Sequence, residues 1–482
     1  MVDCCTPAQA RGKGACARKF SQQKPKQRRM VVRAKAGTFY GWRVVAAVFI
    51  LATFGWGLGF YGPPIYLHAV REARGWSLLM VSTAVTVHFL IGVVVIANLP
   101  MLYKHFGVPN VTKAGSIALA AGVAGWALAW QPWQLFVATF LSGTGWVTMG
   151  AAAVNAIVAP WFVRARPVAL AAAYNGSSIG GVVFSPLWVA AIALLGFAWA
   201  AVSIGLVMIL TIWILADTYY SKTPEQMGLS ADGDGPGASL APVTSPSARL
   251  LPGEQLWKDW RFITLAAGMA LGLFAQIGLL AHLFSLLVPA LGAQVAGLAA
   301  STATAAAIAG RTLVGWLMPV GADRRLVGCG SYVVQIFGSF AFLFAGGENL
   351  SLLLLGMILF GAGIGNATSL PPLIAQVEFV KEDVPRAVPL IVAIGQATYA
   401  FAPATFGFIR ECAPQWGSTS AGAAPWLFLA AALIQALAVA AFLLGRRKRR
   451  APLAHVVRRH VQHVGSRSRP PNTEREQEFD RH

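Results

Sequence analysis

Nine long stretches without any Asp, Glu, Lys or Arg most strongly constrain what this 482-residue chain can fold into. A helix that crosses a bilayer needs about 20 consecutive, mainly apolar residues. Six of the stretches have room for one such helix, and three have room for two; the three long ones break near their middles, at 131–132, 195–196 and 289–294. The stretches are 44–70, 75–103, 114–163, 167–216, 262–310, 326–347, 349–377, 387–409 and 413–445. We therefore predict an all-α membrane protein with twelve transmembrane helices.

The distribution of charge predicts the orientation of these helices. Only 12% of the residues are charged, whereas a soluble domain carries about 25%. The net charge of +20 lies in the two tails and in short loops without a nucleic-acid-binding motif, so we expect no nucleic acid partner. Basic loops mark the cytoplasmic side. With both termini cytoplasmic, every Lys and Arg except Arg71, Arg74 and Arg410 lies on that side. The expected partners are the lipid bilayer and a small-molecule substrate, and the protein is expected to be monomeric.

The two tails leave some alternatives open. Residues 1–37 are basic and lack the apolar segment of a secretory signal. They fit a disordered cytoplasmic tail, an organelle transit peptide, or a start assigned too early, with Met30 as the true start and 1–29 foreign to the native chain. The basic residues 447–482 form a second cytoplasmic tail, and the run that opens it suits anionic lipid. The five cysteines lack metal-site spacing, so neither a metal nor a cofactor is expected.

A long polar segment and a weak internal repeat divide the chain into two halves. Residues 217–259 are rich in Gly, Pro and Ser and are predicted to be a cytoplasmic linker between six-helix bundles at 38–216 and 260–446. Four local patterns recur in the same order, 217–220 residues apart: Gly143-x-Gly145 with Gly361-x-Gly363, the segments at 161–164 and 378–381, Pro100 with Pro319, and Arg166 with Arg386. Both halves begin and end on the same side, so the repeat is parallel. Such an arrangement suits a transporter whose halves rock around a site near the midplane.

Three segments narrow this architecture to a family resemblance. Residues 166–186 (Arg-Pro-x-Ala, then Tyr-Asn-Gly and Ser-Pro), 223–229 (Thr-Pro-Glu-Gln-Met-Gly-Leu) and 40–42 (Tyr-Gly-Trp) resemble bacterial members of the major facilitator superfamily. The branch that they resemble holds the monocarboxylate and oxalate–formate porters. The resemblance covers residues 38–446. It implies transport of a small organic anion, and a place in the bacterial inner membrane.

The chain also departs from that family at several charged positions. In the loop after the second helix, Lys104 and His105 stand where the superfamily has Asp and Arg, ahead of Gly107. Ala307 occupies a position where carboxylate porters carry Asp, and no Lys or Arg lies between Arg386 and Arg410. A nearly uncharged cavity favours a monoanion or a neutral solute over a dianion. The predicted gating-loop residues are Lys104, His105, Gly107, Gly315, Asp323, Arg324 and Arg325.

Few polar side chains lie inside the predicted helices, and ionisable ones in that setting are usually functional. None of the 18 acidic residues is in mid-span, so proton coupling would require His88 or His282. Each histidine could instead donate to a neighbouring carbonyl. Arg311 could pair with a substrate carboxylate or with backbone carbonyls, and the remaining polar residues could equally hold helices together. The candidate substrate-binding residues are Tyr61, Asn155, Asn175, His282, Arg311, Gln396 and Tyr399.

These observations favour a secondary active or facilitative transporter, by symport or antiport, over other classes of protein. An enzyme would need a nucleophile, a base or a metal cluster, and the chain carries none in a recognisable arrangement. It also lacks the phosphate-binding loop of an ATPase. Efflux of drugs or other amphiphiles remains an alternative function, and a membrane sensor that has lost transport is a third.

Overall fold

The computed structural model describes residues 39–233, 253–319, 322–380, 383–412 and 423–446. Within these ranges the chain is helical and contains no strand. The predicted tails at 1–37 and 447–482, and residues 234–252 of the predicted linker, lie outside the described residues.

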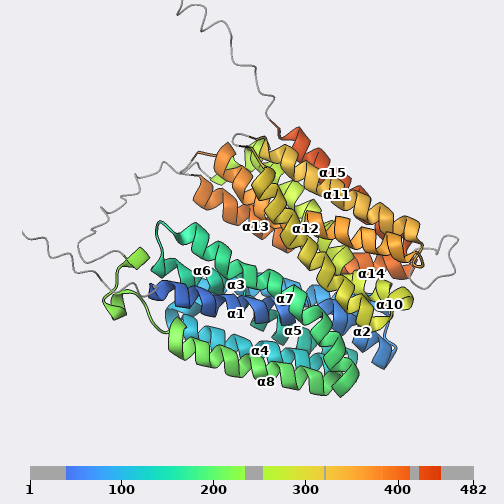
Figure 1. The fold of residues 1–482 in the computed structure, drawn as a ribbon, viewed down its shortest axis with the longest axis horizontal. Coiled ribbons are helices and arrows are strands. Elements are labelled where there is room, and N and C mark those ends of the chain that lie inside the picture. Colours follow the sequence, from blue (N-terminus) through green and yellow to red (C-terminus); the bar gives the residue numbers. More distant parts are fainter. Residues whose placement is uncertain (1–38, 234–252, 320–321, 381–382, 413–422, 447–482) are drawn as a thin grey trace, which may run out of the picture. The chain divides into compact units, whose positions relative to one another are not determined.

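The N-terminal half is built on two sets of packed helices, in which α1 lies against α7 while α4 lies against α5 and α8 (Figure 1). Glycine and proline set its helix boundaries: Gly107 and Gly196 adopt φ +76°, a backbone conformation that favours glycine, and each separates two long helices. The helices are α1 (Tyr40–Gly59), α2 (Pro63–Arg74), α3 (Leu78–Phe106), α4 (Val108–Leu128), α5 (Pro132–Thr148), α6 (Ala151–Val158), α7 (Arg166–Leu195) and α8 (Phe197–Leu215).

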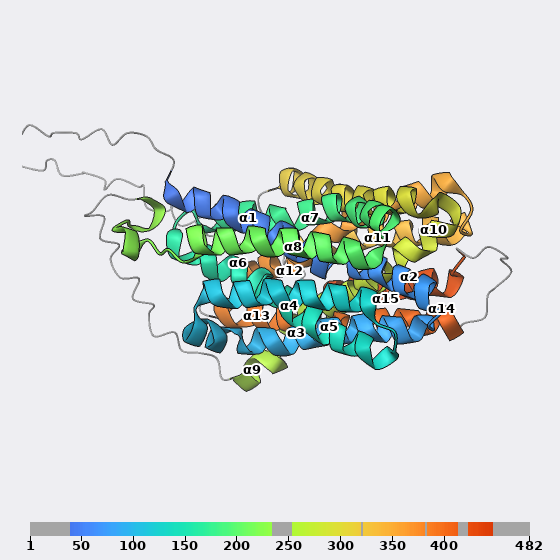
Figure 2. The ribbon, with the colours of Figure 1, turned by 90° about the horizontal axis from the view of Figure 1, so that it is seen from below.

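In the C-terminal half, α12 packs against both α10 and α11, and α15 packs against the same two helices. The long helices of this half lie side by side with those of the N-terminal half in both views (Figures 1 and 2). The helices are α9 (Gly253–Lys258), α10 (Trp260–Leu317), α11 (Arg324–Ala345), α12 (Leu350–Glu378), α13 (Val384–Tyr399), α14 (Ala402–Cys412) and α15 (Pro425–Leu444).

The three predicted breaks within long apolar stretches are confirmed. α4 ends at Leu128 and α5 begins at Pro132, while α7 ends just before Gly196. The third break lies within α10, where Gly292 has φ 71° and ψ 160° and interrupts the helical conformation. A fourth break separates α1 from α2 just ahead of Pro63, as the Gly-Pro-Pro sequence predicts.

Eleven helices of the described residues are long and apolar enough to cross a membrane. The longest, at 58 residues, is the one interrupted at Gly292, and each part exceeds the roughly 20 residues needed to span a bilayer. The predicted count of twelve therefore depends on counting α10 as two crossings. Apolar side chains also cover the outside: Leu206, Leu210 and Ile214 of α8 are 55%, 63% and 66% exposed at four-residue spacing. Such a stripe is stable in lipid and unfavourable in water.

The glycine pairs that indicated the repeat occupy equivalent packing positions in the two halves. A Cβ at Gly143 of α5 would overlap the backbone carbonyl of His88 in α3, and one at Gly361 of α12 would overlap that of Ala303 in α10. Two residues later, Gly145 lies against the backbone of α4 and Gly363 against that of α11. The repeat is therefore a repeat of helix-to-helix contacts that only glycine allows.

Candidate functional site

Within the described residues, the two halves contact each other mainly through four helix pairs: α7 with α10, α3 with α14, α2 with α10 and, less extensively, α3 with α13. The first turn of α1 and the last turn of α15 lie at one end of the bundle, which we call the terminal end, and we call the opposite end the far end (Figure 1). Ser301 donates to the carbonyl of Val182 at 2.7 Å, and the N–H of Ala404 donates to Thr86 at 3.0 Å. These residues lie midway along their helices or nearer the far end, so the halves are joined there.

Tyr61 lies where the two halves face each other. It occupies the break between α1 and α2, and a Cβ at Gly181 of α7 would lie 2.6 Å from its ring and 2.8 Å from Thr304 of α10. Its hydroxyl is close enough to Thr304 for a hydrogen bond, and it interacts electrostatically with Arg311. We call Tyr61, Thr304 and Arg311 the central cluster. Through this cluster, α10 of the C-terminal half lies beside the break between α1 and α2.

A small cavity adjoins the central cluster. Its volume is about 30 Å³, room for one or two water molecules. Most of its wall is apolar and comes from both halves. The lining residues are Tyr61, Pro64, Ile65, Ser185, Leu280, Leu283, Phe284, Ala300, Ala303, Thr304 and Met357. A larger solute would enter only if the halves moved apart.

Arg311 is half-buried and only partly satisfied by the protein. Its Nε donates to the carbonyl of Gly365 in α12 at 2.9 Å, which is the pairing with a backbone carbonyl that the sequence left open for this arginine. Within the described residues, its Nη1 and Nη2 atoms have no hydrogen-bond partner. A guanidinium in this state can still bind a carboxylate through two parallel hydrogen bonds.

Asn155 and Asn175 lie on neighbouring helices of the N-terminal half, and both are exposed. The Asn155 amide donates to the Tyr174 hydroxyl at 2.6 Å and to the carbonyl of Ala151 at 2.8 Å. Asn175 is seven residues, or two helical turns, from Val182 and therefore shares the face of α7 that turns toward the C-terminal half. Asn155 is thus tied to a neighbouring helix, whereas Asn175 points toward the space between the halves.

His88 is buried and satisfied on both ring nitrogens. Its Nδ1 lies 2.8 Å from Ser142 Oγ and its Nε2 lies 2.9 Å from the carbonyl oxygen of Gly59. The ring also stacks on Trp146, with centroids 5.7 Å apart. Because a carbonyl accepts only, Nε2 carries the proton, and the neutral histidine makes all of its hydrogen bonds. His88 thus donates to a neighbouring carbonyl, which is the alternative to proton coupling that the sequence left open.

His282 is fully buried in α10 and satisfied on one side only. Its Nε2 lies 3.0 Å from the carbonyl oxygen of Pro403, while its Nδ1 has no partner among the described residues. Ser82 of α3 lies across Gly407 from it, and the Ser82 hydroxyl is likewise buried without a partner. His282 therefore lies where the two halves meet, with a ring nitrogen free to take part in another interaction.

The helix α13 supplies the last two candidates. Tyr399 is buried, and its ring contacts Phe89 of α3 edge to face with centroids 5.7 Å apart. Gln396 is half-buried one turn earlier. Tyr399 thus lies between the halves, and the central cluster, His282 and Tyr399 approach the same interface from different helices.

The predicted gating residues of the N-terminal half lie at the end of α3 and just after it. Lys104 and His105 are exposed, and His105 Nδ1 lies 3.1 Å from the carbonyl oxygen of Met101 in the same helix. Gly107 adopts a positive φ and joins α3 to α4.

The corresponding residues of the C-terminal half form a bonded network. Arg325 is 1% exposed and binds both oxygens of Glu378, at 2.6 and 2.7 Å. Asp323 caps α11 and accepts from Arg446 at 2.5 Å, and Arg324 donates to the carbonyl of Leu373 at 2.6 Å. Gly315 of α10 has no atom near the position of a Cβ.

A contact that the sequence did not predict lies at the terminal end. Asp232, which follows α8, accepts hydrogen bonds from the backbone N–H groups of Val163, Arg164 and Ala165 at 2.8–3.2 Å. Burial alone would raise the pKa of the Asp232 carboxyl. The three N–H donors and the Arg164 guanidinium outweigh burial and hold that pKa below its usual value. The spacing of residues in the chain could not indicate this contact, because about 70 residues separate the partners.

No group of three His, Cys, Asp or Glu side chains in the described part of the chain could hold a metal ion. The candidate site of the described residues therefore consists of hydrogen-bonding and aromatic side chains that lie between the two helical halves.

Comparison with known proteins gives the family that this chain matches and its relatives in sequence and fold. Residues 44–403 match the family model for the Major Facilitator Superfamily. The chain is similar to MFS-type transporter 1 of Ophiocordyceps sp. (strain BCC 1869), with 27% identity over 72% of this chain and 73% of that protein. It also resembles two solved transporters in fold. One is the nucleoside transporter NupG (TM-score 0.65, 14% identity, 84% of this chain and 100% of that one), and the other a D-xylose–proton symporter (0.62, 14%, 84% and 97%).

Proposed function

The chain belongs to the major facilitator superfamily, and on that premise we propose that it carries a small monoanionic or neutral organic solute by alternating access. A monocarboxylate is the first candidate. The protein is an integral membrane transporter of small solutes and not an enzyme. The choice of solute rests on the residues between the two halves.

The position of Arg311 carries the proposal. Its Nε is fixed by Gly365, its two terminal nitrogens remain available, and Tyr61 of the other half is near enough to interact with it electrostatically. A carboxylate bound to those two nitrogens would accept a further hydrogen bond from Tyr61. Because this contact joins the halves, substrate binding would favour their approach around the solute.

The charge of the site sets the expected charge of the solute. Arg311 is the one basic residue of the central cluster, and Ala307, one turn away, adds no carboxylate. A single guanidinium balances one negative charge, and a second buried negative charge would be costly. The cluster thus suits a monocarboxylate better than a dicarboxylate. The fold relatives are described as transporters of nucleosides and of D-xylose, so neutral solutes belong in the same test.

The twelve-helix topology is part of the same proposal, with α10 crossing twice and the terminal end facing the cytoplasm. The Lys and Arg residues of 1–37 and 447–482, together with the loops of the terminal end, support this orientation. The loops that carry Lys104, His105 and Gly107 in one half, and Gly315 with Asp323 to Arg325 in the other, would then form the cytoplasmic gate. The bacterial inner membrane remains our proposal for the location.

Proton coupling, if present, would use His282. Its unpartnered Nδ1 at the interface of the halves favours it over His88, whose two nitrogens are both engaged. Asn155, Asn175, Gln396 and Tyr399 are the remaining proposed contacts to the solute.

One observation favours the alternative, efflux of an amphiphile. The cavity beside Tyr61 is walled mainly by apolar side chains, among them two leucines, a phenylalanine, an isoleucine and a methionine, which suit an apolar solute. An amphiphile would depend on these apolar walls and would bind without Arg311.

Counterflow into liposomes that contain the purified full-length protein tests the proposal. The panel contains labelled monocarboxylates, dicarboxylates, nucleosides, sugars and cationic dyes. We expect saturable counterflow of a monocarboxylate, reduced at least tenfold by Arg311→Gln and less by Arg311→Lys. Arg43→Gln, which removes an exposed arginine of α1 that is neither a proposed solute contact nor a proposed gating residue, serves as the matched control. Dye counterflow that is unaffected by Arg311→Gln would replace the proposal with the efflux alternative.

A further inference from the structure

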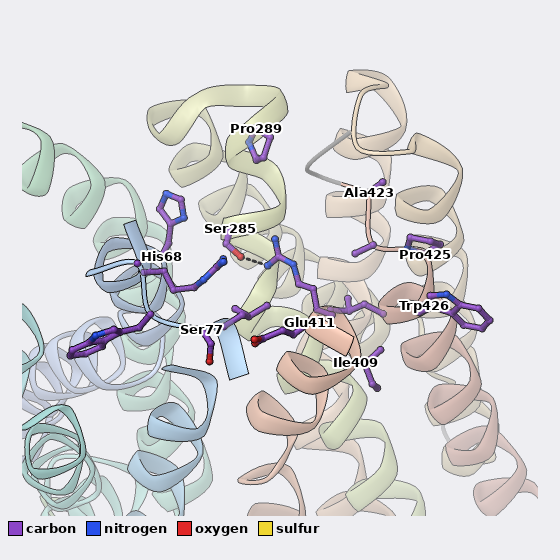
Figure 3. Close-up of a pocket in the computed structure, with 16 residues that line it drawn as sticks. His68, Ser77, Ser285, Pro289, Ile409, Glu411, Ala423, Pro425 and Trp426 are labelled. Atoms are coloured by element: carbon purple, nitrogen blue, oxygen red, sulfur yellow. Dashed lines mark hydrogen bonds between the residues drawn. The ribbon is translucent and has the colours of Figure 1, made fainter. Parts of the chain in front are cut away.

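A second and larger pocket lies at the far end of the bundle, away from the central cluster. Its volume is about 600 Å³, and its walls come from α2 and the following loop, from α10, from α14 and from the start of α15. Both halves therefore contribute to it. Figure 3 shows His68, Ser285 and Glu411 around the pocket, with the hydrogen bond that Ser285 accepts.

Two arginines from opposite halves line this pocket. Arg71 comes from α2 and Arg410 from α14, and each is near enough to act on the charge of the other. Arg410 donates to Ser285 Oγ at 2.6 Å, a partner without charge. The Nε of Arg71 is buried and has no hydrogen-bond partner within the described residues. Two like charges thus converge, and one of them is unsatisfied.

Two acidic side chains lie at or beside the pocket, Glu411 in its wall and Glu72 on α2, and neither pairs with the two arginines. Glu411 accepts a hydrogen bond from the backbone N–H of Leu79 at 2.5 Å. Glu72 is 77% exposed and lies 3.4 Å from His68 in its own helix. In the described ranges, no carboxylate forms an ion pair with Arg71 or Arg410. Partly buried cations normally have a counter-charge, because removing them from water is otherwise costly.

The neighbouring Arg74 shows the usual arrangement. Its Nε donates to the carbonyl of Ala129 at 2.8 Å, and its guanidinium stacks 3.9 Å from the ring of Trp130. All of these partners belong to the N-terminal half. The contrast shows that the unsatisfied state of Arg71 is a property of the pocket and not of arginines at this end of the protein.

We propose that this pocket binds a small monovalent anion, a halide or a short carboxylate, between Arg71 and Arg410 and thereby holds the far ends of the two halves together. The anion supplies the missing counter-charge and bridges α2 to α14. The role in gating rests on the alternating access proposed above, because only halves that separate at the far end would break the bridge. The site is distinct from the central cluster, since it lies at the far end and shares no residue with it.

Thermal unfolding of the purified full-length protein tests the site. One series replaces sodium isethionate by sodium chloride at constant ionic strength, and a second replaces it by sodium formate, so the halide and the carboxylate are assayed separately. The variants are Arg71→Gln and Arg410→Gln, with Arg74→Gln as the matched control and Arg410→Lys as a variant that keeps the charge.

In at least one series, we expect the Tm of the wild type and of Arg74→Gln to rise with saturation, by about 1–2 °C at roughly ten times the apparent Kd. Arg71→Gln and Arg410→Gln should lose this rise, and without the anion Arg71→Gln should be at least as stable as the wild type, because a repulsion is removed. Equal shifts in all variants, or no shift in the wild type in either series, would overturn the proposal.

Arg311→Gln separates this site from the central one. It should keep the full anion-dependent rise in Tm even though it loses transport. If Arg311→Gln alone abolishes the rise, the anion acts at the central cluster and the far-end site is refuted, while the proposed function stands. If no solute is transported but the rise depends on Arg71 and Arg410, the proposed function fails and the anion site stands.

Discussion

Removing the buried guanidinium of Arg325 should destabilise the packing of the helices at the terminal end of the C-terminal half. This side chain binds both oxygens of Glu378 and also donates to the carbonyls of Arg261 and Phe442 and to the hydroxyl of Thr264, at 2.6–3.3 Å. Its contacts therefore join α10, α11, α12 and α15. Breaking a buried ion pair by removing one partner costs about 3–5 kcal/mol, because the remaining charge stays buried. For a chain of this size, this corresponds to a loss in Tm of about 3–5 °C.

Two measurements on Arg325→Gln would detect that loss. The first is Tm in detergent. The second is the rate at which a maleimide labels Cys329, which is buried one turn along α11, in a background where the other four cysteines are serine. Labelling should accelerate as the helices separate. Arg324→Gln is the matched control, because it removes one hydrogen bond from a neighbouring arginine and should cost only about 1 kcal/mol.

The double variant with Glu378→Gln isolates the ion pair. Once the glutamate charge is gone, the second substitution should cost much less than it does alone, which gives a favourable coupling energy of more than 1 kcal/mol. Equal effects of Arg325→Gln and Arg324→Gln, or additive effects in the double variant, would refute the role assigned to the pair.

Three further perturbations test single contacts. Gly176→Ala should lower Tm by several degrees, since its Cβ would overlap a backbone carbonyl of α1. Gly315→Ala, whose Cβ enters open space, should change Tm by no more than about 1 °C. Equal effects of the two substitutions would contradict the packing described here. Asp232→Asn should speed hydrogen exchange of the amides at 163–165. In the wild type, because the Asp232 pKa is lowered, protection should persist below about pH 4 and disappear only as pH falls through the lowered pKa; loss of protection at a higher pH would contradict this sign. His88→Gln should lower Tm and leave the pH profile of transport unchanged; an altered profile would restore a proton-coupling role.

The helical plan of this protein could be predicted because its determinants are local. Glycine and proline fix the breaks at 131–132 and 196, and the lack of charge over about 20 residues fixes the spans. The glycine repeat was also visible in the sequence, and the structure shows what it does: Gly143 and Gly361 each allow a close approach between backbones.

The site itself could be predicted only in part, because contacts between helices depend on how each helix is rotated and paired. Tyr61 and Arg311 were identified as rare polar residues, but the sequence did not single out Thr304, one of many small residues in α10. Arg325 was expected in a gating loop, and its side chain turns into the C-terminal half to reach Glu378, more than 50 residues away. Such distant pairs leave no mark in local sequence.

A reversible cross-link between the halves tests alternating access most directly. A Cβ at Gly297 of α10 would lie 3.4 Å from the Cβ of Val189 in α7, near the 3.5–4.5 Å of a disulfide. Gly205 and Ala120, both in the N-terminal half and 3.0 Å apart by the same measure, provide the matched control pair. In a background without native cysteines, oxidation of the Val189→Cys/Gly297→Cys variant should stop counterflow, and reduction should restore it, while the control pair transports in both states. Undiminished counterflow with the interhalf disulfide fully formed would contradict the account.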